Sequence, residues 1–193
     1  APDLVPVLPR LLAPIPPEVM AELAPLPPTG GLIAIAHRPH ADVSALLASR
    51  GEAPIVLLDR PRHLGNLGAV VRVAAAAGAE GVLALGPHDP WHPAAVRGGA
   101  GLQFAIPVAR IGRLPLVSRP LIAFDPAGGP LGRSSLPPAA VLMFGSERAG
   151  LEAGLLGRAT RVVAIPMRAG VSSLNLATAV AVALYAGCGP PRP

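Results

Sequence analysis

Short apolar runs alternate with helix-forming segments from residue 54 to the end of the chain. The run PIVLLD at 54–59 is almost entirely apolar instead of alternating with polar residues, which is typical of a strand covered on both faces. We expect strands at 54–59, 81–85, 106–109, 121–125, 140–144 and 161–165, and helices at 67–77, 93–99 and about 173–186. This order predicts an α/β fold, with a mostly parallel sheet flanked by helices on both faces.

Prolines dominate the first part of the chain, where nine of the first 30 residues are proline. Proline interrupts the hydrogen bonds of helices and of sheets. We therefore expect an irregular arm with a short helix at 18–23, followed by a strand at 31–36 and a short helix at 42–49. The sequence divides into a proline-rich arm or linker at 1–50 and an α/β domain at 51–193.

The basic residues are all arginines: there are 16 of them and no lysine, and the net charge is +5 with neutral histidines. A positive balance of this kind favours binding to phosphate groups. Biased codon usage would also explain the missing lysines, together with the many alanines, glycines and prolines. Both explanations remain open at this point.

Several classes of protein and site are disfavoured by composition. A single cysteine excludes an internal disulfide and a cysteine-rich zinc site. We expect no metal site, because the histidines lie apart and lack a carboxylate cluster; they are His37, His40, His63, His88 and His92. We expect no transmembrane helix, because the apolar stretch 174–187 is too short and contains polar residues. No secretion signal opens the sequence, which predicts a cytoplasmic protein.

The first segment with unusual polar residues is LLDRPRHLGNLGAVVRVAAAAGAEG, residues 57–81. Asn66 is a good residue for the N-cap of the helix expected at 67–77. Six residues later, Arg72 lies among alanines, valines and leucines. A buried guanidinium needs an acceptor, so Arg72 either reaches water along its stem or meets a specific partner. Taken alone, the segment is better explained by a helix cap and an arginine whose guanidinium reaches water than by a functional site.

The second segment is VLMFGSERAGL, residues 141–151. A buried strand ends here in Gly145, Ser146 and Glu147, which places a carboxylate and free backbone N–H groups at the carboxyl end of the sheet. Open α/β folds bind ligands at this edge. The alternative is an ordinary strand-to-helix turn in which Glu147 only favours the start of a helix.

The third segment is VVAIPMRAGVSSLNLATAVAVALYAG, residues 162–187. Pro166 ends the expected strand, and Ser172 or Ser173 can cap the last helix. Asn175 then falls in the first turn of an apolar helix, where a buried amide needs a specific partner. Capping explains the serines and leaves Asn175 unexplained.

Together the three segments resemble the motifs of the SpoU (TrmH-like) family of SPOUT methyltransferases. The family pattern is an asparagine six residues before an arginine, a Gly-Ser-Glu turn, an Ile-Pro-Met triplet and a Ser-Leu-Asn triplet. This sequence has Asn66 and Arg72, then 145–147, 165–167 and 173–175, in the same order. The resemblance covers about residues 54–187. It departs at Gly99, where the family commonly has a serine.

The resemblance implies S-adenosylmethionine as the cofactor, an α/β knot with a deep trefoil knot at the carboxyl end, and a homodimer. The reaction it implies is methyl transfer to a ribose 2′-hydroxyl of structured RNA, either ribosomal or transfer RNA. Residues 51–193 would be the catalytic methyltransferase domain. One interpretation of the arm at 1–50 is the remnant of an RNA-binding domain.

The resemblance also implies which residues hold the cofactor. Backbone groups of Gly145, Ile165 and Leu174 would bind it, with Met167 nearby. Apolar walls with main-chain hydrogen bonds suit an adenosine. We expect Gly145→Val to block this cleft by bulk.

The implied catalytic residues are Arg72, Asn66, Glu147, Ser173 and Asn175. An arginine is a permanent cation, so the role of Arg72 that agrees with its charge is to stabilise the developing alkoxide and hold the adjacent phosphate. Glu147 and Asn66 would orient Arg72, and the two remaining residues would position the ribose.

Two other functions are considered. One is a catalytically inactive SPOUT-fold RNA-binding or scaffold protein. The other is a nucleotide-binding oxidoreductase, which is disfavoured because no G-x-G-x-x-G follows the first strand. Exposed arginines are candidates for phosphate contacts in either RNA-binding case; these are Arg60, Arg62, Arg97, Arg110, Arg148 and Arg168.

Overall fold

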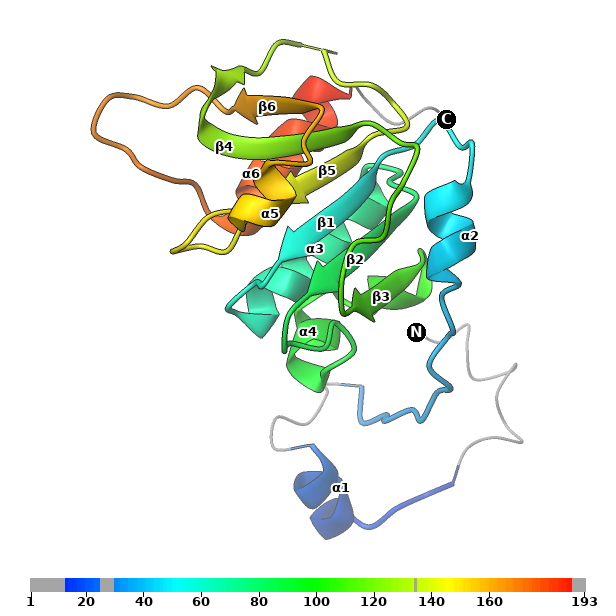
Figure 1. Cartoon of the computed structure of the whole chain (residues 1–193). Helices are drawn as coiled ribbons and strands as arrows, with labels where there is room; N and C mark the ends of the chain where they lie inside the picture. Colours follow the sequence, from blue (N-terminus) through cyan, green and yellow to red (C-terminus); the bar gives the residue numbers. More distant parts are fainter. Residues whose placement is uncertain (1–12, 25–29, 134, 189–193) are drawn as a thin grey trace. The chain divides into compact units, whose positions relative to one another are not determined.

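Six parallel strands form one sheet in the order β3-β2-β1-β5-β4-β6 (Figure 1). The computed structural model describes residues 13–24, 30–133 and 135–188. The strands are β1 (Ile55–Asp59), β2 (Gly81–Leu85), β3 (Val108–Ile111), β4 (Leu121–Pro130), β5 (Val141–Phe144) and β6 (Arg161–Ala164). The six strands expected between residues 54 and 165 are present, and the predicted parallel α/β fold is confirmed.

Two strands differ in length or position from the expected ranges. β3 begins two residues later than 106, because Pro107 has no N–H and only its carbonyl joins the neighbouring strand, accepting from Val82. β4 runs on to Pro130, with a register shift between Phe124 and Gly129 against β6. Gly128 makes this shift possible, because a Cβ there would lie 2.6 Å from the backbone nitrogen of Val163.

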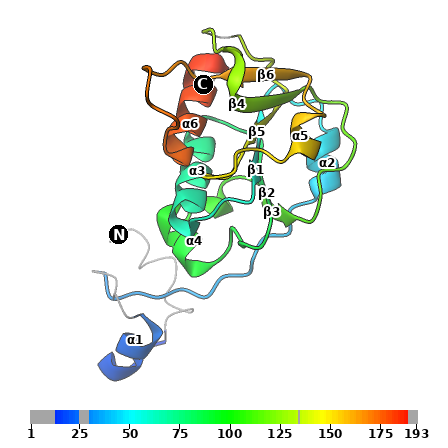
Figure 2. The same cartoon turned by 60° about the vertical axis from the view of Figure 1, so that its left-hand side comes forward.

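Helices cover both faces of the sheet, as Figure 2 shows with the sheet turned towards its edge. They are α2 (Val43–Ala48), α3 (Leu64–Ala76), α4 (Pro93–Gly98), α5 (Ala153–Leu156) and α6 (Leu176–Val182), with a 3-10 turn at Leu102–Phe104 and a π-helical turn at Ala183–Gly187. One core lies between the sheet and α3 and α6, and it includes Leu67, Val70 and Val180. The other lies under α2 and α5, and it includes Leu46 and Leu155.

The chain divides into two compact units, 1–38 and 39–193. Helix α2 belongs to the second unit, because Leu46 and Leu47 are buried in its core. The domain therefore begins earlier than residue 51. In the first unit, α1 (Pro17–Leu23) matches the expected helix.

The strand expected at 31–36 is wrong, because these residues are exposed and form no strand. Ile35 is fully exposed, so its apolar side chain lacks the burial that a strand in the sheet would give it. The earlier prolines up to residue 12, and those at 25, 27 and 28, lie outside the described residues.

A buried arginine links the segments at the amino end of the sheet by hydrogen bonds. Arg119 is 6% exposed and forms an ion pair with Glu80. Its guanidinium also donates to the carbonyl oxygens of Ser49 and Ala53 at 3.0 Å and of Ala139 at 3.2 Å. These bonds join the end of α2 to the segments that enter β1, β2 and β5.

None of the helices in the described part of the chain is long and apolar enough to cross a membrane. The described residues also contain no group of three or more histidine, cysteine or acidic side chains that could hold a metal ion. Burial raises the pKa of the Cys188 thiol to about 11, so this thiol is protonated at neutral pH and is a poor nucleophile.

Candidate active site

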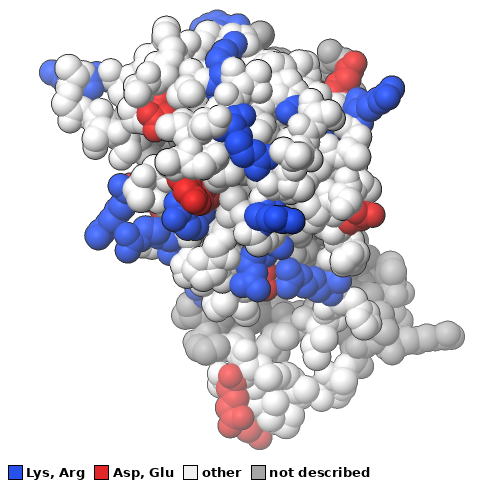
Figure 3. Space-filling view, viewed as in Figure 1, with Lys and Arg blue, Asp and Glu red and all other residues white. Residues whose placement is uncertain are grey.

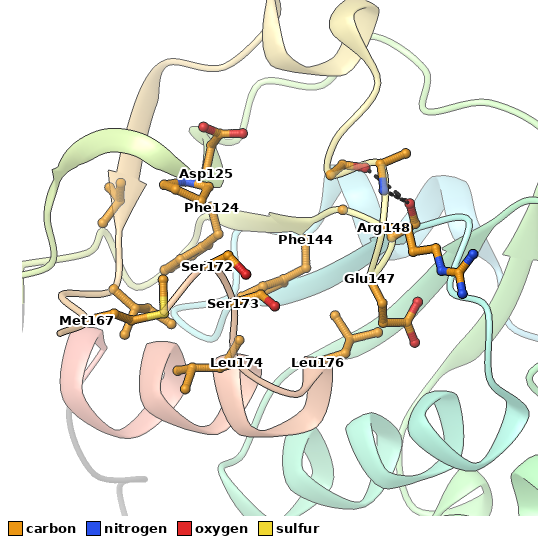
Figure 4. Close-up of a pocket in the computed structure, with 18 residues that line it drawn as sticks. Phe124, Asp125, Phe144, Glu147, Arg148, Met167, Ser172, Ser173, Leu174 and Leu176 are labelled. Atoms are coloured by element: carbon orange, nitrogen blue, oxygen red, sulfur yellow. Dashed lines mark hydrogen bonds between the residues drawn. The ribbon is translucent and has the colours of Figure 1, made fainter. Parts of the chain in front are cut away.

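A cavity of about 390 Å³ lies where β5 and β6 end and beside the middle of β4. Three segments far apart in the sequence line it: residues 124–126 of β4, the turn after β5, and the segment between β6 and α6 (Figure 4). The lining residues are Phe124, Asp125, Pro126, Phe144, Gly145, Ser146, Glu147, Arg148, Ala149, Gly150, Val163, Ile165, Met167, Ser172, Ser173, Leu174, Leu176 and Ala179. All four residues expected to hold the cofactor are in this set.

The turn after β5 is closed by reciprocal backbone bonds. The amide of Ser146 donates to the carbonyl of Gly150 and the amide of Gly150 donates to the carbonyl of Ser146, both at 3.0 Å. Gly145 is required at the start of the turn, because a Cβ there would lie 2.0 Å from the carbonyl carbon of Gly150. Valine at this position would therefore collide with the turn itself, and not simply fill the cleft as expected. No helix begins at Glu147, so the ordinary strand-to-helix turn is wrong.

A chain of side-chain hydrogen bonds joins the three sequence motifs. The Asn66 amide nitrogen donates to Glu147 Oε1 at 3.0 Å, and the Asn175 amide nitrogen donates to Asn66 Oδ1 at 3.1 Å. The backbone amide of Arg62 donates to Glu147 Oε2 at 3.0 Å. Both carboxylate oxygens of Glu147 are thus held by donors from the loop and helix that follow β1.

Both asparagines have local roles that differ from those expected. Asn66 is the third residue of α3 and does not cap it, because the helix already begins at Leu64 after His63. Its side chain is therefore free to bond to the two other motifs. Asn175 is the N-cap of α6, with Oδ1 accepting from the amides of Ala177 at 2.9 Å and Thr178 at 3.4 Å. The expected capping by Ser172 or Ser173 is wrong, since both precede the cap.

Glu147 is held in its charged form. Burial raises the pKa of its carboxyl group, but the hydrogen bonds from Asn66, from backbone amides and the nearby His63 lower it by more, so that the net pKa is below the usual value. At neutral pH Glu147 is a carboxylate that accepts hydrogen bonds. It can orient a donor or a cation, and it cannot act as a general acid at that pH.

The walls of the cavity are largely apolar. The rings of Phe124 and Phe144 stack at 4.5 Å between centroids, with 9° between their planes. Figure 4 shows Met167, Leu174 and Ser173 on the other side of the same space, on the segment that leads to α6. Leu174 is partly exposed although apolar, so one of the walls lies open to solvent.

Three of the expected catalytic residues, Asn66, Arg72 and Asn175, do not line the cavity. The two asparagines are joined to Glu147 by hydrogen bonds, whereas Arg72 is not. The Arg72 side chain is exposed and has no hydrogen bond or ion pair with any described residue. It lies six residues after Asn66 on α3, which turns it roughly 120° around the helix axis. Glu147 and Asn66 form no hydrogen bond with Arg72 in the structure, and their expected role in orienting it stays a prediction.

Among the lining side chains that the sequence reasoning missed are Phe124 and Asp125. Both lie in β4, which was expected only as a buried strand. Asp125 accepts from the amide of Ala127 at 2.9 Å, so its carboxylate is fixed beside the cavity. The apolar pattern of a buried strand did not predict this role, because it does not show which residues of the strand border a cavity.

Comparison with known proteins agrees with this arrangement. The family model described as the SpoU rRNA Methylase family matches residues 53–185, which include all three motifs. The chain belongs to the SpoU family. Asn66, Glu147 and Asn175, joined by hydrogen bonds in the structure, thus lie within the matched region of a SpoU protein.

Curated SpoU relatives are similar over the same region. A tRNA/rRNA methyltransferase of Synechocystis sp., described as uncharacterized, is 37% identical over 139 residues, covering 67% of this chain and 51% of the relative. The 23S rRNA (uridine(2479)-2′-O)-methyltransferase of Streptomyces viridochromogenes is 33% identical over 144 residues, covering 67% of this chain and 50% of the relative. The chain spans about half the length of these relatives.

Solved SpoU structures share the fold. The methyltransferase AviRb from Streptomyces viridochromogenes, in complex with the cofactor AdoMet, has a TM-score of 0.67 and 29% identity, covering 76% of this chain and 63% of AviRb. A structure described as giving insights into the 2-OH methylation of C/U34 on tRNA has a TM-score of 0.61 and 30% identity, covering 70% of this chain and 94% of that protein.

Proposed function

We propose that the chain is an S-adenosylmethionine-dependent RNA 2′-O-ribose methyltransferase acting on ribosomal or transfer RNA. The observation that carries this proposal is the convergence of the three motifs. The Gly145–Glu147 turn and the 165–174 segment line one cavity. Beside it Asn66 donates to Glu147, and Asn175 donates to Asn66. The names of the SpoU relatives support the same reaction class.

The residues of the cavity fit S-adenosylmethionine. A volume of about 390 Å³ lies in the usual range of roughly 300–1,000 Å³ for small-molecule sites. The stacked rings of Phe124 and Phe144 and the side chains of Ile165 and Leu174 give an apolar surface for adenosine. Two carboxylates, Asp125 and Glu147, supply negative charge beside a cationic ligand. When bound, the cofactor would supply an electrophilic methyl group.

The chain's own task is to position a ribose hydroxyl and to stabilise the charge that develops on it. Asn66 donates to the Glu147 carboxylate and is itself held by Asn175. Ser173, on the segment that leads to α6, would contact the ribose. The Arg72 cation would stabilise the developing alkoxide and hold the adjacent phosphate. A phosphate oxygen or water would take the proton, because Arg72 has no free lone pair at neutral pH.

We also propose a homodimer, because Arg72 lies outside the cavity of its own chain and a second protomer would give it a cavity to face. In such a dimer Arg72 of one protomer could face the cavity of its partner. Exposed apolar side chains near α6 agree with a protein partner here; these are Val171, Leu174 and Tyr185. We further propose the trefoil knot between β6 and α6, and a cytoplasmic location, where ribosomal and transfer RNA are substrates.

The substitution Arg72→Ala tests the proposed reaction. Because Arg72 is exposed and has no partner among the described residues, its loss should leave folding and cofactor affinity unchanged. Methyl transfer to RNA should fall by at least about 100-fold, the usual cost of losing one donor to a developing oxyanion.

The assay would follow radiolabelled methyl groups from S-adenosylmethionine into ribosomal and transfer RNA, with nuclease mapping of the 2′-O position. Arg133→Ala serves as the control, since Arg133 is also exposed and lines none of the cavities. Wild-type protein that binds the cofactor and RNA without transferring a methyl group would instead indicate the inactive RNA-binding alternative.

A further inference from the structure

A second cavity of about 360 Å³ lies at the carboxyl ends of β1 and β2, beside the loop that follows β3. It shares no lining residue with the first cavity. The lining residues are Asp59, Arg60, Leu85, Gly86, Gly112, Arg113, Leu114, Glu152, Gly154, Leu155 and Arg158. Three arginines and two carboxylates make this cavity strongly polar.

Asp59 holds one of the arginines in a fixed orientation. Asp59 is 1% exposed, and its two oxygens accept from Nε and a terminal nitrogen of Arg60 at 2.9 and 3.1 Å. The same carboxylate accepts from the amide of Glu152 at 2.8 Å. Arg60 has a positive φ of 50°, and Gly86 leaves room for it, because a Cβ at Gly86 would lie 2.9 Å from Arg60 Cγ. The Arg60 guanidinium is thus preorganised at the cavity.

The other two arginines differ in how they are held. Arg158 donates to the carbonyl oxygens of Leu114 at 2.7 Å and Pro115 at 2.5 Å, which fixes its guanidinium at the wall. Arg113 is exposed, and no described residue forms a hydrogen bond or ion pair with it. Arg113 therefore has all its donors available for a ligand.

The charges of the cavity indicate what kind of anion fits. Three arginines against Asp59 and Glu152 leave one net positive charge. A phosphodiester carries one negative charge, whereas a phosphate monoester carries about 1.5 to 2 at neutral pH. Balance of charge therefore favours a phosphodiester over a free phosphate or a terminal phosphate.

The two cavities are connected through a pair of loops. The loop after β1 carries Arg60 at the second cavity and donates the Arg62 amide to Glu147 at the first. The turn after β5 carries Glu147 and continues within five residues to Glu152. The two cavities are therefore bordered by the same two loops. In Figure 3 blue side chains gather across the middle of the view, over the carboxyl ends of these strands.

We propose that the second cavity binds a backbone phosphodiester of the RNA strand near the nucleotide that is methylated at the first cavity, with Arg113 and Arg60 as the donors. This inference rests on the proposed function for the identity of the polymer. Phosphate contacts of this kind set the register of the strand without reading its bases.

The experiment measures binding of the full chain to a mixed-sequence single-stranded oligoribonucleotide over a series of salt concentrations. Each phosphate contact contributes about 0.7 to the slope of log K against log salt for a single strand. We expect Arg113→Ala to reduce this slope by about that amount and to weaken binding. Arg113→Lys should restore the slope, because the charge is kept. The control Arg133→Ala should leave it unchanged, and cofactor affinity should be the same in all variants.

An Arg113→Ala slope equal to that of wild type would overturn the proposal, as would absence of RNA binding by the full chain. Displacement of the RNA by inorganic phosphate at concentrations at which chloride of equal ionic strength has no effect would overturn the phosphodiester assignment. The binding assay requires no methyl transfer, so its outcome is separate from that of the Arg72 test. If Arg113→Ala leaves the salt slope unchanged while the wild-type protein methylates RNA, only the phosphate site at the second cavity is contradicted, and the proposed function stands.

Discussion

The two ends of the sheet each fix a glutamate, but they do so with different partners. At the amino end Glu80 pairs with the buried guanidinium of Arg119. At the carboxyl end Glu147 accepts from neutral donors, the side chain of Asn66 and the amide of Arg62. The first arrangement cancels the charge, and the second fixes the carboxylate while leaving its charge uncompensated.

This difference separates a structural site from a binding site. A charge compensated within the fold has little left to offer a ligand, and Arg119 is committed to four carbonyl and carboxylate groups. Glu147 retains its negative charge beside an open cavity, where a cationic ligand or an arginine can supply the missing positive charge. Substitutions at the amino end should therefore change stability alone, and those at the carboxyl end should change binding and catalysis.

The largest effect is expected for Gly145→Ala at the carboxyl end. The added Cβ would lie 2.0 to 2.4 Å from backbone atoms of Gly150 and Leu151, so the turn cannot close. Cofactor binding, measured by calorimetry, should be abolished. Gly129→Ala is the control, since a Cβ there meets no atom within 4 Å. Retained cofactor affinity in the Gly145 variant would show that the turn does not shape the site.

A large loss of stability is expected for Arg119→Met at the amino end. The change removes the guanidinium donor from Glu80 and from three carbonyl oxygens, and breaking a largely buried pair costs about 3 kcal/mol in the free energy of unfolding. Denaturant unfolding would measure it. The double variant with Glu80→Gln should recover part of the loss. If Arg119→Met changed cofactor affinity in the folded protein, the separation between the two ends would fail.

An intermediate effect is expected for Glu147→Gln. The variant keeps the shape and an oxygen for Asn66, but it loses the charge and turns an NH₂ group towards the Arg62 amide. We expect methyl transfer to fall roughly 10- to 100-fold, or about 1.4–2.7 kcal/mol in the activation free energy. Stability should change far less than in Arg119→Met. An equal loss of stability at both ends would mean that Glu147 is simply a structural residue.

The pH dependence of this variant gives an independent check. The pKa of Glu147 is lowered in the folded protein, so its carboxylate stabilises the fold above the usual carboxyl pKa and loses that effect as the pH falls through the lowered value. The difference in unfolding free energy between wild type and Glu147→Gln should shrink on acidification below about pH 4.5. A difference that is constant from neutral to acid pH would contradict the assigned ionisation.

The fold could be predicted from the sequence because its signal is local. The buried strands are short apolar runs, and each helix between them has its own pattern, so β1, β2 and β5 appear where expected within a residue or so. The strand expected at 31–36 failed because an apolar run forms a strand only when another strand pairs with it. The four-residue helix α5 was too short for any periodic pattern to indicate.

The sequence predicted which residues form the site, but it did not predict the hydrogen bonds that join them. Asn66 was expected to cap α3 because asparagine before an apolar helix usually does so. Its partners are Glu147 and Asn175, which are 81 and 109 residues away in the sequence, and no local pattern carries that information. The same holds for Arg72, because the way α3 packs on the sheet decides whether this side chain points to the cavity or to solvent.

The smallest effect is expected for Asn175, where one side chain both caps α6 and joins the hydrogen-bonded chain at the carboxyl end. Asn175→Ala should lose both roles, with a loss of about 1 kcal/mol in unfolding free energy for the cap. Asn175→Ser should keep the cap but be too short to reach Asn66, so its stability should stay close to wild type.

Comparing the two variants in one unfolding series and one methyl-transfer series separates the roles. If the link to Asn66 positions the site, the serine variant should lose as much activity as the alanine variant, several-fold, while retaining the stability that the alanine variant loses. If the serine variant instead keeps both stability and activity, and only the alanine variant loses both, Asn175 contributes only the cap. The carboxyl end would then depend only on Glu147 and its two donors, the Arg62 amide in the loop after β1 and the Asn66 side chain in α3.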